Sequence, residues 1–146
     1  MPGERAPVLV VRRLIRSTPE KVFRLWTVPE LMARWMSPYP GPVRARVVAD
    51  VRVGGSFRLE MGSEASTCEI EGTFLEVHFP SRLVFTWTGP PTLGAETLVT
   101  LALRAVAEGT ELVLTHEKLP SDDVRKRHHT GWEAFLDHLE TEAPPG

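Results

Sequence analysis

The sequence has few of the features that mark secreted, membrane-bound or nucleic-acid-binding proteins. Cys68 is the only cysteine, so an internal disulfide is excluded and a reducing, cytoplasmic setting is the expected location. The 17 basic and 19 acidic residues leave a net charge of −2, which provides no electrostatic footprint for nucleic acid or for an anionic membrane. No apolar run approaches the length of a membrane span, and the first residues lack the apolar core of a signal peptide. We therefore expect no nucleic-acid partner and no membrane partner.

Recognisable catalytic and metal-binding motifs are also missing. No glycine cluster has the strand–turn–helix setting of a phosphate-binding loop or a nucleophile elbow. Glu69, Glu71 and Glu76 come from one expected strand, and alternation turns the first two outward, so paired-carboxylate chemistry is not expected. His128 and His129 are neighbours on an expected helix and point about 100° apart, so they cannot hold one metal ion from a single face. The sequence predicts neither a metal site nor a cofactor.

What is present is typical of one globular domain. The 146 residues are 42% hydrophobic and 25% charged, and a chain of this length can bury a substantial core. No repeat, linker or low-complexity tract divides it. We interpret residues 1–146 as a single domain in which residues 143–146 form a frayed tail.

The most informative stretch is the last one, from Leu119 to Glu142. On a helix of about 100° per residue its apolar residues lie within an arc of about 140°, which predicts an amphipathic helix with a wide buried stripe. Ser121 is placed to cap this helix, and Asp122 and Asp123 suit the positive end of its dipole. The stripe consists of Val124, His128, Gly131, Trp132, Phe135, Leu136 and Leu139.

Alternating or β-branched apolar residues predict strands through most of the preceding chain. The expected strands cover residues 8–15, 43–50, 56–61, 67–77, 82–88, 96–106 and 110–117. Two short helices are expected after the first strand. Ser17 or Thr18 is the expected N-cap of the first helix, with Pro19 in the first turn and Glu20 three residues after Ser17, where a capping box would place it. Pro29 opens the second helix. This order predicts an α+β protein in which the long C-terminal helix covers one face of an antiparallel sheet.

Several short motifs resemble one known family. They are Ser17–Phe23, Pro29–Leu31, Arg34–Met36, Arg52–Arg58, Gly72–Val77, Pro80–Trp87, Gly109–Leu112, Leu114–His116, Gly131–Trp132, Leu136 and Leu139. In this order, over nearly the whole chain, they are similar to the C-terminal domain of the activator of the heat-shock protein 90 ATPase, within the START and birch-pollen-allergen superfamily (SRPBCC). The resemblance implies the helix-grip fold, a curved antiparallel β-sheet wrapped around a long C-terminal α-helix, with two short helices after the first strand. It implies no single activity, since the superfamily hosts lipid carriers, hormone receptors, polyketide cyclases and co-chaperones.

That fold geometry leads us to expect an apolar pocket between the sheet and the C-terminal helix. A strongly curved sheet under one straight helix leaves space that can hold a ligand. His116, Arg125 and His128 are the polar exceptions on the inward faces, with His116 and Arg125 as candidate anchors. The expected pocket residues are Phe57, Leu59, Ile70, Phe85, Trp87, Leu101, Leu103, Leu114, His116, Arg125, His128, Trp132, Phe135 and Leu139.

Core packing is the alternative for each of these residues, and the sequence leaves it open. A buried histidine such as His116 is often satisfied inside the core, and Arg125 and His128 can reach solvent from a helix end. Gly131 costs about 1 kcal/mol against alanine in a helix interior. It indicates either a ligand close to the backbone or tight packing on Phe57 or Trp87.

Three functions are compatible with this reading. The first is a binding protein for a small hydrophobic molecule, since apolar lining with few polar exceptions favours desolvation as the driving force. The second, implied by the resemblance, is a chaperone-associated protein-interaction module with a role in stress response. The third is an enzyme of the cyclase or hydrolase kind, with His116 or His128 as its acid–base group.

Overall fold

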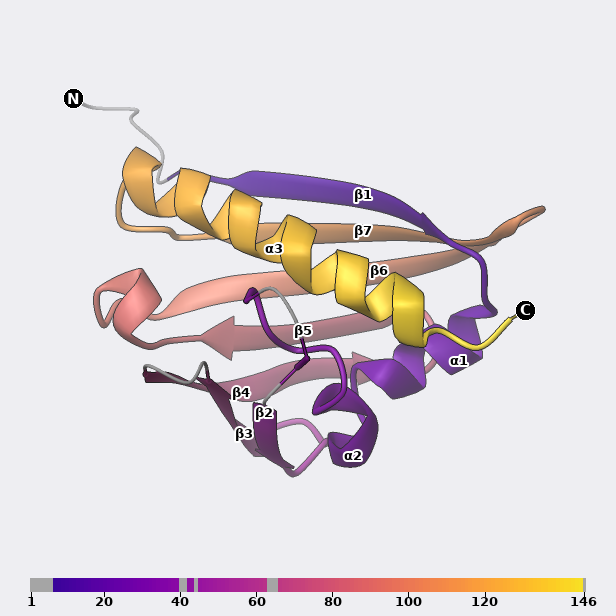
Figure 1. Cartoon of the computed structure of the whole chain (residues 1–146), viewed down its shortest axis with the longest axis horizontal. Helices are drawn as coiled ribbons and strands as arrows, with labels where there is room; N and C mark the ends of the chain where they lie inside the picture. Colours follow the sequence, from indigo (N-terminus) through magenta and orange to yellow (C-terminus); the bar gives the residue numbers. More distant parts are fainter. Residues whose placement is uncertain (1–6, 40–41, 44, 63–65, 146) are drawn as a thin grey trace.

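The structure is a computed structural model that describes residues 7–39, 42–43, 45–62 and 66–145. Within those residues, one antiparallel sheet in the order β1-β7-β6-β5-β4-β3-β2 forms a layer, and the long helix α3 (Asp122–Glu142) lies across one of its faces (Figure 1). The strands are β1 Leu9–Ile15, β2 Ala45–Ala49, β3 Ser56–Gly62, β4 Thr67–His78, β5 Arg82–Trp87, β6 Thr97–Val106 and β7 Gly109–Glu117. The expected α+β helix-grip fold is confirmed.

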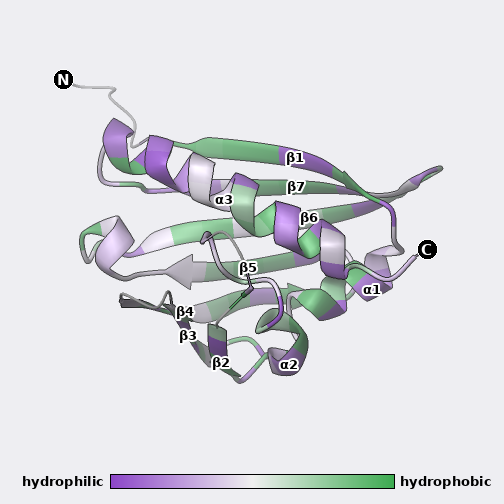
Figure 2. Cartoon of the chain, in the orientation of Figure 1, coloured by the Kyte–Doolittle hydropathy of each residue, from purple (hydrophilic) through white to green (hydrophobic). Residues whose placement is uncertain are grey.

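The amphipathic pattern of α3 explains how it sits on the sheet. Val124, His128, Trp132, Phe135, Leu136 and Leu139 are its buried residues, as the periodicity predicts. The opposite face of the helix is largely hydrophilic (Figure 2). Ser121 caps the helix as expected, with its hydroxyl accepting a hydrogen bond from the backbone N–H of Val124 at 3.2 Å.

The two short helices follow β1 as predicted, although the first begins one residue later than the capping box implied. Helix α1 spans Pro19–Leu25, and its cap is Thr18, whose hydroxyl accepts from the N–H of Lys21 at 3.3 Å. Ser17 is instead fully buried, and Glu20 is not in the box position. Helix α2 spans Pro29–Met32. Proline occupies the first turn in both, where its missing N–H costs no hydrogen bond.

The sheet bends where β4 changes register. The pairing of β4 with β5 shifts between Phe74 and Glu76, and just before it the N–H of Thr73 donates to the hydroxyl of Thr86 at 2.8 Å. Gly72 lies so close to the carbonyl of Thr86 and the ring of Phe57 that a Cβ there would clash. Glycine at this position therefore serves close packing of the bend and not an opening for a ligand.

Most element bounds agree with the sequence to within two residues, and the exceptions are in loops. The 3-10 turn η1 (Pro90–Thr92) lies between two predicted strands, where the sequence predicts no helix or strand. Part of the strand predicted from Val43 lies outside the described residues, and β2 begins at Ala45. In the predicted tail, Ala143 packs against the core and Pro145 accepts a hydrogen bond from Nζ of Lys21 at 2.8 Å, while residue 146 is outside the described part.

Candidate functional site

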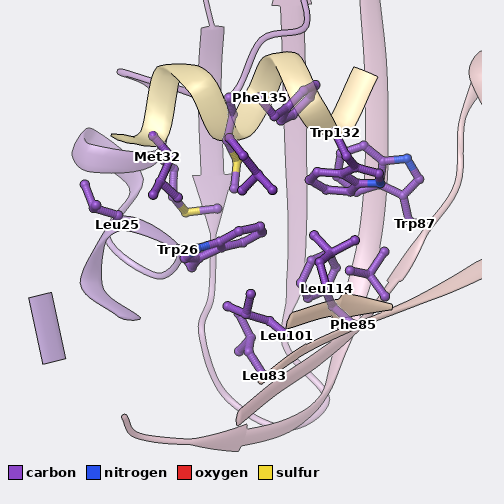
Figure 3. Close-up of a cluster of buried hydrophobic side chains, with 14 of the residues drawn as sticks. Leu25, Trp26, Met32, Leu83, Phe85, Trp87, Leu101, Leu114, Trp132 and Phe135 are labelled. Carbon is purple, nitrogen blue, oxygen red and sulfur yellow. The ribbon is translucent and has the colours of Figure 1, made fainter. Parts of the chain in front are cut away.

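Aromatic side chains fill the space between α3 and the middle of the sheet. Trp26 is 1% exposed and lies beside Trp132 of α3, with ring centroids 6.1 Å apart (Figure 3). Trp35 is fully buried, packs edge-on against Phe135 and donates its indole N–H to the carbonyl of Leu25 at 2.7 Å. A void beside Trp26, lined also by Met32, Met36, Phe57, Phe74, Phe85 and Trp87, holds only about 10 Å³. An enclosed pocket beneath α3, as the sequence led us to expect, is therefore too small for a ligand, because Trp26 and Trp35 occupy its volume.

An open apolar groove lies beside α3 instead, at the edge of this core. It has a volume of about 310 Å³ and separates residues 127–135 of α3 from η1 and its flanking loop. We call it the α3–η1 groove. Its lining residues are Pro38, Met61, Trp87, Pro90, Pro91, Leu93, Arg127, His128, Gly131, Trp132 and Phe135.

The wall opposite α3 is a short, internally bonded turn. Pro90 and Pro91 restrict its backbone, and the buried hydroxyl of Thr92 accepts from the N–H of Gly89 at 3.2 Å and donates to the carbonyl of Ala95 at 2.7 Å. Leu93 follows with φ of 56°, in the left-handed region, and is 72% exposed. The turn thus holds an apolar side chain at the rim of the groove, where it has no core to join.

Gly131 opens the helix side of the groove. Among the described residues, a Cβ built on it meets only Cβ of Pro38, at 3.9 Å, which is ordinary van der Waals contact. Neither Phe57 nor Trp87 packs tightly on this position, so the packing alternative from the sequence is wrong here. A larger side chain at this position would project into the groove.

His116 is a core residue with both ring nitrogens occupied. The indole N–H of Trp132 can only donate, so Nδ1 of His116 accepts it at 3.0 Å and the imidazole proton resides on Nε2. Nε2 then donates to Oγ1 of Thr97 at 2.7 Å, and the Thr97 hydroxyl donates to the carbonyl of Trp87 at 2.5 Å. Burial and, to a smaller extent, the neighbouring His128 lower the pKa of His116 to about 3. His116 is therefore neutral, paired and unavailable as a ligand anchor in this arrangement.

His128 differs from His116 because one of its nitrogens has no partner. Its Nδ1 lies 2.9 Å from the carbonyl of Val124, one helical turn earlier, and must donate to that oxygen. Nε2 is buried and has no partner in the part of the chain that the structure describes, and the same holds for the indole N–H of Trp87. Both residues line the groove. Burial lowers the pKa of His128 and so favours the neutral ring, while its bond to Val124 acts in the opposite direction and raises the pKa by less.

The structure divides the predicted pocket residues into groups. Trp87, His128, Trp132 and Phe135 line the groove. The buried core holds Phe57, Leu59, Ile70, Phe85, Leu101, Leu103, Leu114, His116 and Leu139. Arg125 is absent from the groove lining and pairs with Asp122 at 2.8 Å. Sequence reasoning missed six residues of the groove lining. Met61 and Arg127 are two of them, and the other four lie in irregular segments that carry no periodicity: Pro38, Pro90, Pro91 and Leu93.

A larger depression of about 680 Å³ lies on the face of the sheet away from α3. Ser56 and Arg58 line it from strand positions that alternate with the buried ones, and Thr86 of β5 lines it as well. Its charged side chains Asp50, Arg58, Glu71 and Glu96 are exposed to water, which satisfies them. The α3–η1 groove is the better candidate, since buried polar atoms in its walls lack partners. In the described part of the chain no group of three or more His, Cys, Asp or Glu residues could hold a metal ion.

The fold and the groove together define a helix-grip protein with an apolar groove beside its C-terminal helix. The chain belongs to the family of Activator of Hsp90 ATPase homolog 1-like proteins, whose family model matches residues 16–143. This family is part of the SRPBCC/START superfamily. A search of curated proteins gave no match.

Solved structures support the fold across nearly the whole chain. A protein from Chromobacterium violaceum is 22% identical with a TM-score of 0.83, covering 95% of this chain and 98% of its own. A Rhodobacter sphaeroides protein is 28% identical with a TM-score of 0.78, covering 97% and 93%. An AHSA1-like protein from Aeromonas hydrophila is 22% identical with a TM-score of 0.74, covering 93% and 91%. Among the described residues, no helix combines the length and apolar character that crossing a membrane requires.

Proposed function

We propose that this protein binds a small lipophilic molecule in the α3–η1 groove. The observation that carries the proposal is the opening at Gly131, where α3 presents bare backbone to a groove walled by Trp132, Phe135 and Leu93. A volume of about 310 Å³ is at the small end of the range for small-molecule sites. Burying ~200 Å² of apolar ligand surface at about 25 cal/mol per Å² yields ~5 kcal/mol of desolvation free energy, which offsets the cost of association.

Filling the groove from the helix side tests this proposal. Gly131→Leu places an isobutyl group where the ligand would lie, and we expect binding of a naphthalene-sized probe to fall at least about tenfold. Gly131→Ala is the matched control: of the described residues its single methyl group meets only Pro38, at 3.9 Å, so binding should persist. The measurement is a ligand-observed NMR titration with 2-methoxynaphthalene. Equal binding by the leucine and alanine variants would place the probe elsewhere and contradict the proposal.

The other two functions stay predictions. The family description favours a chaperone-associated role, which an ATPase assay with the cognate chaperone would test. An acid–base role for His116 is disfavoured, because both of its nitrogens are committed to Trp132 and Thr97. The cytoplasmic location also stays a prediction, motivated by the single cysteine.

A further inference from the structure

We propose that the ligand of the α3–η1 groove carries a hydroxyl group, and that this hydroxyl donates a hydrogen bond to Nε2 of His128. The ligand is thereby a neutral alcohol or phenol with an apolar body, and not a carboxylate. This inference rests on the proposed function and adds the chemical class of the ligand and the residue that selects it.

The protonation of His128 follows from its partner. A carbonyl oxygen can only accept, so the 2.9 Å contact with Val124 places the imidazole proton on Nδ1. In the neutral ring Nε2 is then an acceptor. His128 is 8% exposed, and Nε2 has no partner among the described residues. A buried acceptor without a hydrogen bond is unfavourable, so a ligand that supplies a donor gains more than contact area alone.

Among the described residues, the adjacent His116 does not take that role. The ring of His116 is the nearby polar group, with its centroid 5.0 Å from that of His128 and perpendicular to it. Its Nε2 proton is already given to Thr97 and its Nδ1 already accepts from Trp132. Because both nitrogens of His116 are already hydrogen-bonded, Nε2 of His128 stays free to accept a hydrogen bond from a ligand.

A second unpaired atom of the groove lining matches a hydroxyl as well. The indole N–H of Trp87, a residue 3% exposed, is buried and finds no acceptor within residues 7–39, 42–43, 45–62 and 66–145. A hydroxyl can donate to Nε2 of His128 and accept from the indole N–H of Trp87. A carboxylate can only accept, and its negative charge would be repelled by the lone pair on Nε2 of His128. Arg127 is the cation of the lining but is exposed to water, where an ion pair contributes little.

Nε2 is buried in the unliganded groove, so a ligand reaches it only when a neighbouring side chain of the groove moves. Nδ1 keeps its bond to the carbonyl of Val124 throughout, which holds the proton on Nδ1 and leaves Nε2 as the acceptor. The ligand hydroxyl thus adds a hydrogen bond to the atom that had none.

A probe series that differs in one group tests the inference. We expect 2-naphthol to bind about tenfold more tightly than 2-methoxynaphthalene, whose ether has no donor, and 2-naphthoate to bind most weakly. His128→Phe should abolish the preference for 2-naphthol while 2-methoxynaphthalene still binds. His128→Met serves as a second variant if the phenylalanine does not fold. The readouts are NMR titrations and the ¹⁵N shift of His128 Nε2, which should move only with 2-naphthol.

The outcomes separate this inference from the proposed function. Equal affinities for 2-naphthol and 2-methoxynaphthalene, both blocked by Gly131→Leu, would overturn the hydroxyl selection and leave the groove as a binding site. A preference that survives His128→Phe would also overturn it, as would tightest binding of 2-naphthoate. If no probe binds the wild-type protein, the proposed function itself fails.

Discussion

At the scale of single residues, the two buried histidines show how partners decide roles. His116 and His128 both lie on inward faces, and the sequence treats them alike. In the structure His116 has partners on both nitrogens, whereas His128 has one partner and borders the groove. The difference arises from Trp132 of α3 and Thr97 of β6, which both form hydrogen bonds with His116 of β7.

The depressed pKa of His116 predicts a loss of stability on acidification. Its pKa is about 3 in the folded protein and near 6.5 in the unfolded chain, so between these values the unfolded state binds more protons. The free energy of unfolding should therefore fall as the pH drops below about 6.5, by up to ~1.4 kcal/mol per pH unit from this residue. Urea unfolding between about pH 7 and about pH 5 measures the slope.

His116→Gln is the control for this prediction. A glutamine side chain offers an acceptor and donors to Trp132 and Thr97 but does not titrate. Its stability should depend less on pH in the same interval, where the paired carboxylates are still ionised. Identical slopes for wild type and variant would assign the acid sensitivity to another group.

At the scale of elements, Arg13 of the edge strand β1 forms ion pairs with α3. Its guanidinium lies 2.9 Å from Glu140, 3.0 Å from Asp137 and 3.3 Å from Glu133, all on successive turns of α3. It also donates to the backbone carbonyl of Glu133 at 3.2 Å. The side chain of Arg13 is 16% exposed, so these pairs are screened less than surface pairs. These ion pairs hold α3 against β1, in addition to the packing of its apolar stripe on the sheet.

Removing the Arg13 charge should loosen α3. Arg13→Met keeps most of the alkyl chain but leaves three carboxylates facing one another, and we expect a loss of about 1–3 kcal/mol in the free energy of unfolding. Arg12→Met, at the exposed neighbouring position, is the matched control and should cost under about 0.5 kcal/mol. Chemical denaturation at low and high salt measures both, and the difference between the variants should shrink with salt. Equal effects would show that the ion pairs contribute nothing.

At the scale of the whole molecule, the packing of α1 and α2 decides whether the fold is hollow. Trp26 and Trp35 extend from this region into the buried core between the sheet and α3. Met32 and Met36, together with Trp26, line the void of about 10 Å³ that remains in this core. Met is flexible and fills irregular gaps well. The result is a closed core with its ligand-accessible space displaced to the α3–η1 groove.

Truncating Trp26 should reopen the core. Trp26→Ala is expected to cost about 3–5 kcal/mol, because a fully buried side chain is lost and a cavity remains. If the fold survives, binding of naphthalene should increase, since the cavity adjoins Trp87. Phe79→Ala, at an aromatic residue 54% exposed, is the control and should cost far less. Urea denaturation and an NMR titration measure the two effects. A loss below about 1 kcal/mol would mean that the core collapses around the change.

The sequence by itself determined the elements and their order. The stripe of α3, the alternation of strands and the proline-led starts of α1 and α2 are local patterns, set by periodicity and backbone restriction. The family motifs then implied how these elements assemble. Periodicity also placed Phe57, Leu101, Leu114 and Phe135 on the inward faces, and all four are buried in the structure.

Only the tertiary structure decided where space remains. A pattern tells which way Trp26, Trp35 or Gly131 faces, but not how much volume lies in front of it. That volume depends on side chains from distant segments: two tryptophans closed the expected pocket, and Pro38, Pro90 and Leu93 from irregular loops formed another. Packing and cavities are sums over contacts between elements, so no stretch of the chain carries them alone.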